Sequence, residues 1–165
     1  MDVDEFERLF RSEYPRLVRS LTLVCGDREV AADVVQDAFV QAHRHWRRVA
    51  GYDDPATWVR RVAVNRALNH RRGVRRLGSF VARSGRPDRH RVEAPDIAAE
   101  VDLWRAVADL PPQQRHAVAL HYLADLPLAE IAAALGIQTG TVKAHLHHAR
   151  AALADRLGTP TGGSQ

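Results

Sequence analysis

Apolar side chains recur every three or four residues along two stretches of this chain, and an arginine-rich segment without that spacing separates them. The first stretch runs from Val3 to about Arg76, and the second begins at Ile97 and continues to about Leu157. Spacing of this kind predicts helices that each bury one face. No stretch shows the alternation typical of a strand. The pattern therefore predicts an all-α protein made of two small helical domains.

Local signals divide the first stretch into three helices. The first is expected from Val3 to Cys25, and Pro15 is predicted to kink or divide it. Asp27 is placed to cap the second helix, and Asp54 followed by Pro55 is a strong start signal for the third. The expected apolar face of the second helix comprises Val30, Val34, Val35, Ala38, Phe39, Ala42 and Trp46.

The central segment LGSFVARSGRPDRHRVEAP mixes glycine, serine, proline and arginine and has no apolar stripe. It is predicted to be a flexible linker over residues 77–95 between domains of residues 1–76 and 96–157. The tail GTPTGGSQ, residues 158–165, is predicted to be disordered.

The second domain contains the sharpest motif, AEIAAALGIQTGTVKAHLHHAR. A short helix from Leu128 to Leu135 ends at Gly136, which permits a left-handed turn, and Ile137 fills the corner before a last helix. This arrangement predicts a helix-turn-helix, although a plain helical hairpin is the alternative. The candidates for the end that faces a DNA groove are Gln138, Thr139, Thr141, Lys143, His145 and His147.

Positive charge is concentrated in one part of the chain. The net charge is +4, and Lys143 is the only lysine. From Arg60 to Arg91 there are eleven arginines and two histidines against one acid. Residues Arg61, Asn65, Asn69, Arg72 and Arg76 follow one another at about one helical turn. Guanidinium groups neutralise phosphates and amides bond to base edges, so this face predicts a nucleic-acid partner. A solvated basic face, or a genome that favours arginine codons, is the alternative.

The second expected helix carries a different kind of surface. Asp33, Gln36, Asp37 and Gln41 project polar groups beside Phe39 and Arg44, two side chains that could reach the surface of this helix. Such an arrangement is suited to docking on the helices of another protein, and an ordinary amphipathic helix is the alternative.

Taken in order, these motifs resemble a known family. The segments DVVQDAF, DDPATWVRRVAVNRALNHRR and LPPQQRHAVALHYLADLPLAEIAAALGIQTGTVKAHLHHAR resemble the extracytoplasmic-function (ECF, group IV) sigma factors of the sigma-70 family, over about Phe6 to Leu157. The resemblance implies a region 2 helical bundle and a region 4 helix-turn-helix that direct promoter recognition and DNA melting. It also implies core RNA polymerase, through the clamp helices of its largest subunit and its flap, promoter DNA and an anti-sigma factor as partners.

The resemblance assigns residues to three surfaces. Matches to the polymerase-binding motif are Asp33, Gln36, Asp37 and Phe39. Residues implied for the minus-ten element are Tyr52, Trp58, Arg61, Asn65, Asn69 and Arg72, with the loop Ala50 to Asp54 placed to capture an extruded base. Residues implied for the minus-thirty-five element are Gln138, Thr139, Thr141, Lys143, His145, His147 and Arg150. Many relatives have arginines where this chain has His145 and His148, and often aspartate at Asn69, so affinity at the minus-thirty-five element is expected to be weaker or pH-dependent.

Other classes of protein fit less well. The segment IAAALGIQTGTVKAHL is also similar to response-regulator and quorum-type activators, but these place a strand-containing domain ahead of it. An enzyme is disfavoured, because no glycine-rich phosphate loop, nucleophile elbow or metal-ligand cluster is present; no catalytic residue, metal or other cofactor is predicted. Cys25, the single cysteine, is expected to be a core residue in a reducing cytoplasm. No leader and no apolar stretch of about 20 residues is seen, which favours a cytoplasmic protein.

Overall fold

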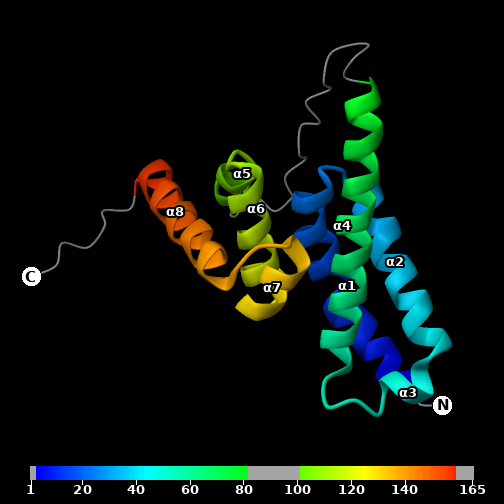
Figure 1. The fold of residues 1–165 in the computed structure, drawn as a ribbon. Coiled ribbons are helices and arrows are strands. Elements are labelled where there is room, and N and C mark those ends of the chain that lie inside the picture. The colour runs from blue at the N-terminus through cyan, green and yellow to red at the C-terminus, as the bar shows by residue number, and fades with distance from the viewer. Residues whose placement is uncertain (1–2, 82–100, 159–165) are drawn as a thin grey trace, which may run out of the picture. The chain divides into compact units, whose positions relative to one another are not determined.

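The computed structural model describes residues 3–81 and 101–158, and both ranges are almost entirely helical (Figure 1). The chain divides into two compact units, residues 1–91 and 92–165. Neither described range contains a strand, which confirms the all-α prediction. Most of the predicted linker and tail lies outside the described residues. These ranges also contain no helix long and apolar enough to cross a membrane.

The first unit is built from helices α1 (Val3–Cys25), α2 (Arg28–Arg44), α3 (Trp46–Val49) and α4 (Pro55–Val81), of which α1, α2 and α4 pack against one another. Helix α1 runs continuously through Pro15, so the proline does not divide it. Leu17 and Leu21, which follow the proline, are fully buried, and this packing holds the helix together across the missing hydrogen bond. Helix α4 continues past Arg76, where the linker was predicted to begin.

Both predicted helix starts are present. The Asp27 carboxylate caps α2 by accepting hydrogen bonds from the backbone N–H groups of Glu29 at 2.7 Å and Val30 at 3.2 Å. The Asp54 carboxylate caps α4 by accepting from the Thr57 N–H at 3.3 Å and from the Thr57 hydroxyl at 2.6 Å. The residues at which α2 and α4 begin are therefore determined by nearby capping side chains.

Apolar faces of α1, α2 and α4 form the core of the first unit. Its fully buried members include Leu17, Leu21, Leu23, Ala31, Val35, Ala38, Val59, Ala63, Val64 and Ala67. Burial of each leucine or valine side chain stabilises the folded state by about 1.5 to 3 kcal/mol relative to leaving that side chain in water. Cys25 lies at the edge of this core, and desolvation raises the pKa of its thiol to about 11. Cys25 is half-buried, so the predicted core residue is only partly enclosed.

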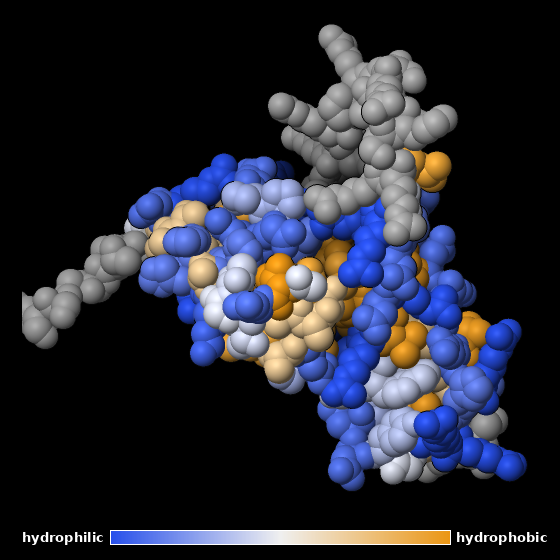
Figure 2. All heavy atoms as spheres, viewed as in Figure 1, coloured by the Kyte–Doolittle hydropathy of each residue, from blue (hydrophilic) through white to orange (hydrophobic). Residues whose placement is uncertain are grey.

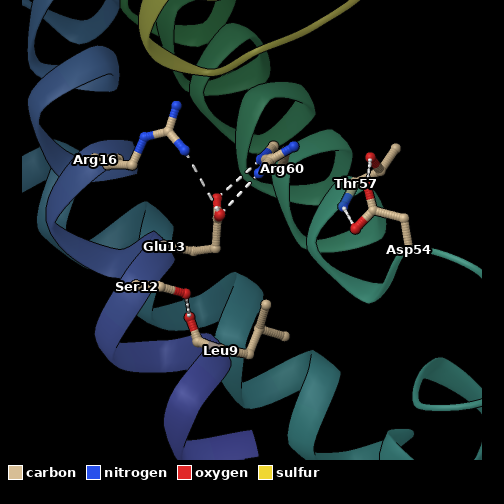
Figure 3. Close-up of polar contacts among 7 residues, drawn as sticks. All are labelled: Leu9, Ser12, Glu13, Arg16, Asp54, Thr57 and Arg60. Carbon is tan, nitrogen blue, oxygen red and sulfur yellow. Dashed lines mark hydrogen bonds and ion pairs between the residues drawn. The ribbon is translucent and has the colours of Figure 1, made fainter.

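A buried ion pair joins α1 to α4 within this core (Figure 3). Glu13 is only 6% exposed, and its two carboxylate oxygens accept hydrogen bonds from Arg60 Nε at 2.8 Å and Arg60 Nη2 at 2.7 Å. The guanidinium of Arg16 lies farther from the same carboxylate, at 3.9 Å. The bidentate geometry supplies the hydrogen bonds that a buried charge pair requires.

The second unit contains α5 (Val101–Ala108), α6 (Pro112–Val118), a π-helical turn η1 (Ala119–Leu123), α7 (Leu128–Leu135) and α8 (Thr139–Leu157). Gly136 ends α7 in the left-handed region, with φ of 67°, as predicted for a helix-turn-helix. Val142, Leu146 and Ala149 of α8 are buried. The periodicity did not predict the π-helical turn.

We expect Glu13→Gln to lower the free energy of unfolding of the first unit by about 3 kcal/mol, because the Arg60 guanidinium then stays buried without its counter-charge. Urea unfolding of the full chain measures the loss. A Trp104→Phe background leaves the fluorescence of Trp46 and Trp58, which both belong to the first unit.

Arg16→Ala is the matched control, since that guanidinium is 44% exposed and lies 3.9 Å from Glu13. Its expected loss is below about 1 kcal/mol. Equal losses for the two variants would contradict a stabilising role for the buried pair.

Candidate nucleic-acid interface

One long face of α4 is polar and open to solvent. Arg61, Asn65, Asn69 and Arg72 are all exposed, whereas Val59, Ala63, Val64 and Ala67 on the opposite side are fully buried. The surface over α4 is largely hydrophilic (Figure 2). Arg72 Nη1 donates to Asn69 Oδ1 at 3.5 Å, which keeps these two side chains close together. The side chain of Arg76, predicted for the same face, lies outside the described residues.

Two aromatic residues lie near the start of α4. Tyr52 lies in the turn between α3 and α4, where its backbone N–H donates to the Val49 carbonyl at 3.1 Å, and Trp58 lies on the first turns of α4. Both side chains are half-buried, so part of each residue remains accessible. An aromatic ring with an open face can stack on an unpaired base of any identity.

Asp54 makes the start of α4 sensitive to acid. The Thr57 hydroxyl bond is the largest cause that holds the pKa of the Asp54 carboxyl below its usual value, and the backbone N–H of Thr57 and the charge of Arg60 lower it further. Each of these groups favours the charged carboxylate. The Asp54 cap of α4 is therefore complete at neutral pH.

The predicted docking residues of α2 do not all share one environment. Asp33, Gln36 and Asp37 are exposed, whereas Phe39 is only 2% exposed and belongs to the buried apolar face on which it was predicted. Its ring packs against Phe10 with centroids 4.9 Å apart and against Phe6 at 6.2 Å. Burial of this large ring in the interface between α1 and α2 explains its position.

An apolar groove of about 550 Å³ opens beside this helix. Its lining residues are Phe6, Phe10, Tyr14, Gln36, Phe39, Val40, His43 and Arg44. Gln36 belongs to both the groove and the predicted docking face, and Val40 is 43% exposed. The Phe39 ring therefore forms part of the groove wall beside the predicted docking face.

Arg66 of α4 reaches the same side of α2, which the sequence did not indicate. Its Nη1 lies 3.7 Å from the Asp37 carboxylate and its Nη2 donates to Gln41 Oε1 at 3.2 Å. Both charged side chains are substantially exposed, so the pair contributes little to stability. No local signal identifies the pair, because the partners lie on different helices.

The amino-terminal part of α8 presents polar side chains to solvent. Gln138, Thr139, Thr141, Lys143, His147 and Arg150 are exposed, and His145 is half-buried. Lys143, His147 and Arg150 follow at steps of four and three residues, so they lie on one stripe of the helix. Arg150 Nε donates to the hydroxyl of Tyr122 at 2.6 Å, a contact that the periodicity did not predict. Among the described residues, no three histidine, cysteine, aspartate or glutamate side chains gather as metal ligands.

A helical bundle with an exposed arginine and asparagine face, together with a separate helix-turn-helix, defines a DNA-binding protein of transcription. The chain matches the family Sigma-70 region 2 over residues 9–77 and Sigma-70 region 4 over residues 100–153. It is 32% identical to the ECF RNA polymerase sigma factor SigM of Mycobacterium tuberculosis over 153 residues, which cover 93% of this chain and 77% of SigM. It is also 32% identical to the RNA polymerase sigma-E factor of Streptomyces coelicolor, covering 94% and 88% of the two chains. The chain therefore belongs to the ECF RNA polymerase sigma factors and directs promoter recognition.

Solved structures share the fold. The sigma factor RpoE of Bartonella quintana, solved in complex with the anti-sigma factor NepR, aligns with a TM-score of 0.62 and 22% identity over 96% of this chain and 99% of that one. CnrH, solved in complex with the cytosolic domain of CnrY, aligns with a TM-score of 0.52 and 22% identity over 94% and 89% of the two chains. No relative supports the response-regulator alternative.

We expect Asp54→Asn to reduce the loss of folding stability that occurs at acidic pH. The pKa of Asp54 is lowered in the folded chain, so its stabilising contribution is complete above the ordinary value of 3.8 and is lost as the pH falls through the lowered pKa. Asparagine keeps a capping oxygen but does not titrate. Urea midpoints between pH 7 and pH 2 should therefore fall less steeply for Asp54→Asn than for the parent chain.

Asp53→Asn is the matched control, because Asp53 is an exposed carboxylate of the same turn and is not the cap of α4. Its acid profile should follow the parent. Superimposable profiles for Asp54→Asn and the parent would show that the cap is not coupled to pH.

Proposed function

We propose that this chain acts at initiation by docking on core RNA polymerase through α2, contacting the minus-ten element through α4, and contacting the minus-thirty-five element through α8. The observation that carries the proposal is the separation of faces. Polar residues predicted for DNA are exposed on α4 and α8, and the apolar side of each helix is buried. DNA-facing residues need such access, whereas core residues do not.

Melting of the minus-ten element is proposed to use binding energy alone. Base stacking on Tyr52 or Trp58 is worth about 1 to 3 kcal/mol per base, which offsets part of the cost of unstacking it. Arg61 and Arg72 would meet phosphates, and Asn65 and Asn69 would bond to exposed base edges. No step of this kind requires a catalytic residue or a cofactor, so we propose that the chain is not an enzyme.

The minus-thirty-five contact is proposed to follow helix-turn-helix geometry. In that motif the second helix enters the major groove and its first residues meet base edges. Gln138, Thr139 and Thr141 occupy the corresponding start of α8, and Lys143 and Arg150 add charge for phosphates.

Polymerase docking is proposed to involve the acidic and amide groups of α2. Asp33, Gln36 and Asp37 form an exposed polar row, and the Arg66 guanidinium lies 3.7 Å from the Asp37 carboxylate. A polar row beside an apolar groove offers both charged contacts that steer association and an apolar surface that contributes affinity.

Three further assignments follow from family membership. An anti-sigma factor is proposed as a partner, since the structural relative RpoE was solved in complex with the anti-sigma factor NepR. The chain is proposed to work in the cytoplasm, where polymerase and promoters are. Region 2 is proposed for residues 1–76 and region 4 for residues 96–157, with helix α4 extending beyond the first of these to Val81.

In-vitro transcription tests the proposal directly. Purified core RNA polymerase is incubated with a genomic fragment library, with and without the chain, and the transcript starts are sequenced. New start sites that share an upstream sequence motif are expected only when the chain is present. An identical set of starts in the two reactions would refute the proposal.

We expect Asp37→Arg to weaken binding to core polymerase by at least about tenfold, which is 1.4 kcal/mol, because the substitution reverses a charge in the docking row. Affinity is measured by fluorescence anisotropy of the labelled full chain, and a thermal melt by circular dichroism confirms the fold. Glu29→Arg makes the same charge change at an exposed position of the first turn of α2. It should alter the affinity by less than about threefold, and an unchanged affinity for Asp37→Arg would remove α2 from the docking surface.

A further inference from the structure

In the second unit, the exposed side chains of Tyr122 and Arg150 form a contact that the helix-turn-helix geometry does not require. Arg150 on α8 donates through Nε to the Tyr122 hydroxyl at 2.6 Å, and its guanidinium carbon lies 5.8 Å from the centroid of the Tyr122 ring. The two residues are 28 positions apart in the chain. The short distance and the charged donor make this a strong hydrogen bond for a surface pair.

Tyr122 is held in place by its surroundings. It lies on η1, where the backbone hydrogen bonds lengthen to a π-helical pattern and the N–H of Ala124 donates to the carbonyl of Ala119 at 3.1 Å. Turns of this kind are rare and recur at functional sites. The His121 ring meets the Tyr122 ring edge-on, with centroids 4.7 Å apart. Tyr122 is nevertheless 47% exposed, so neither core packing nor burial explains its tyrosine hydroxyl.

The Arg150 side chain has further donors after this contact. A guanidinium carries five N–H groups, and the bond from Nε uses one of them. Within the part of the chain that the structure describes, the bond to Tyr122 is the only hydrogen bond of the Arg150 side chain. The four N–H groups on Nη1 and Nη2 therefore remain for an anion with two acceptor oxygens, such as a phosphodiester. Lys143 lies two turns away on the same stripe of α8.

We propose that Tyr122 is a positioning residue that orients the Arg150 guanidinium toward a backbone phosphate of promoter DNA, an inference that rests on the proposed contact of α8 with the minus-thirty-five element. An arginine on an exposed helix loses rotamer entropy when it binds. A hydroxyl that already fixes Nε reduces that loss, so the guanidinium meets the phosphate in a prepared orientation. Tyr122 thus contributes to DNA affinity without touching DNA itself.

The test uses the full chain assembled with core RNA polymerase and a labelled duplex. The duplex spans the upstream motif of a start site found in the transcription experiment. Tyr122→Phe removes only the hydroxyl and is expected to weaken binding by about threefold to tenfold, the factor that corresponds to one hydrogen bond. In an Arg150→Ala background the same substitution should change binding by less than about 1.5-fold, because the residue that Tyr122 orients is gone.

Salt dependence separates a positioning role from a structural one. Arg150→Ala should reduce the slope of log affinity against log salt by about one phosphate contact, and Tyr122→Phe should reduce it in the same direction. Arg156→Ala is the matched control, since it removes an arginine of α8 that is ion-paired to Asp109 at 3.0 Å, and its slope should stay near the parent value. Thermal melts of each variant report the fold independently.

Two failures are distinguishable. If Lys143→Ala and Arg150→Ala both leave duplex binding unchanged, α8 does not contact DNA, and the proposed minus-thirty-five contact fails together with the inference drawn from it. If both weaken binding while Tyr122→Phe does not, or if Tyr122→Phe weakens it equally in the Arg150→Ala background, only the role of Tyr122 is overturned.

Discussion

The buried pair between Glu13 and Arg60 is the constraint on which the first unit depends. Removing a carboxylate and a guanidinium from water costs several kcal/mol for each ion, and only close bidentate geometry returns that energy. A shift of α1 along α4 by one residue would break both hydrogen bonds. An apolar interface alone tolerates such shifts better, because leucine and valine contacts are not directional. The pair therefore fixes the axial position and the rotation of α4 against α1.

Rotation of α4 decides which of its arginines face solvent. Arg60 points inward to Glu13, so Arg61, one residue further, is turned about 100° away and is exposed. Arg66 reaches across to Asp37 and Gln41 on α2. The arginines of α4 thus have three different environments: Arg60 is in a buried ion pair, Arg66 is in a surface ion pair, and Arg61 is on the exposed face. Charge density alone could not separate these roles, although it correctly placed a basic face on this helix.

Features that depend on neighbouring residues were predictable from the sequence. Asp27 and Asp54 cap their helices through side chains that reach only two or three residues ahead, and Gly136 adopts its left-handed turn because it has no side chain. Features that depend on a distant partner were not. Glu13 is paired with a residue 47 positions away, and Asp37 of α2 lies beside Arg66 of α4. A surface assigned from one helix therefore needs the packing of the next helix before its members are known.

The same dependence on distant partners shapes α8. Ahead of Arg156, helix α8 carries only two lysine or arginine side chains, Lys143 and Arg150. With few charges available, the orientation of each has more influence on the affinity for a phosphate backbone. Tyr122, which lies on the π-helical turn η1 and is distant in sequence, restrains the Arg150 side chain through a hydrogen bond. A helix poor in charge can thus retain a defined electrostatic contact because another element of the fold holds its arginine in place.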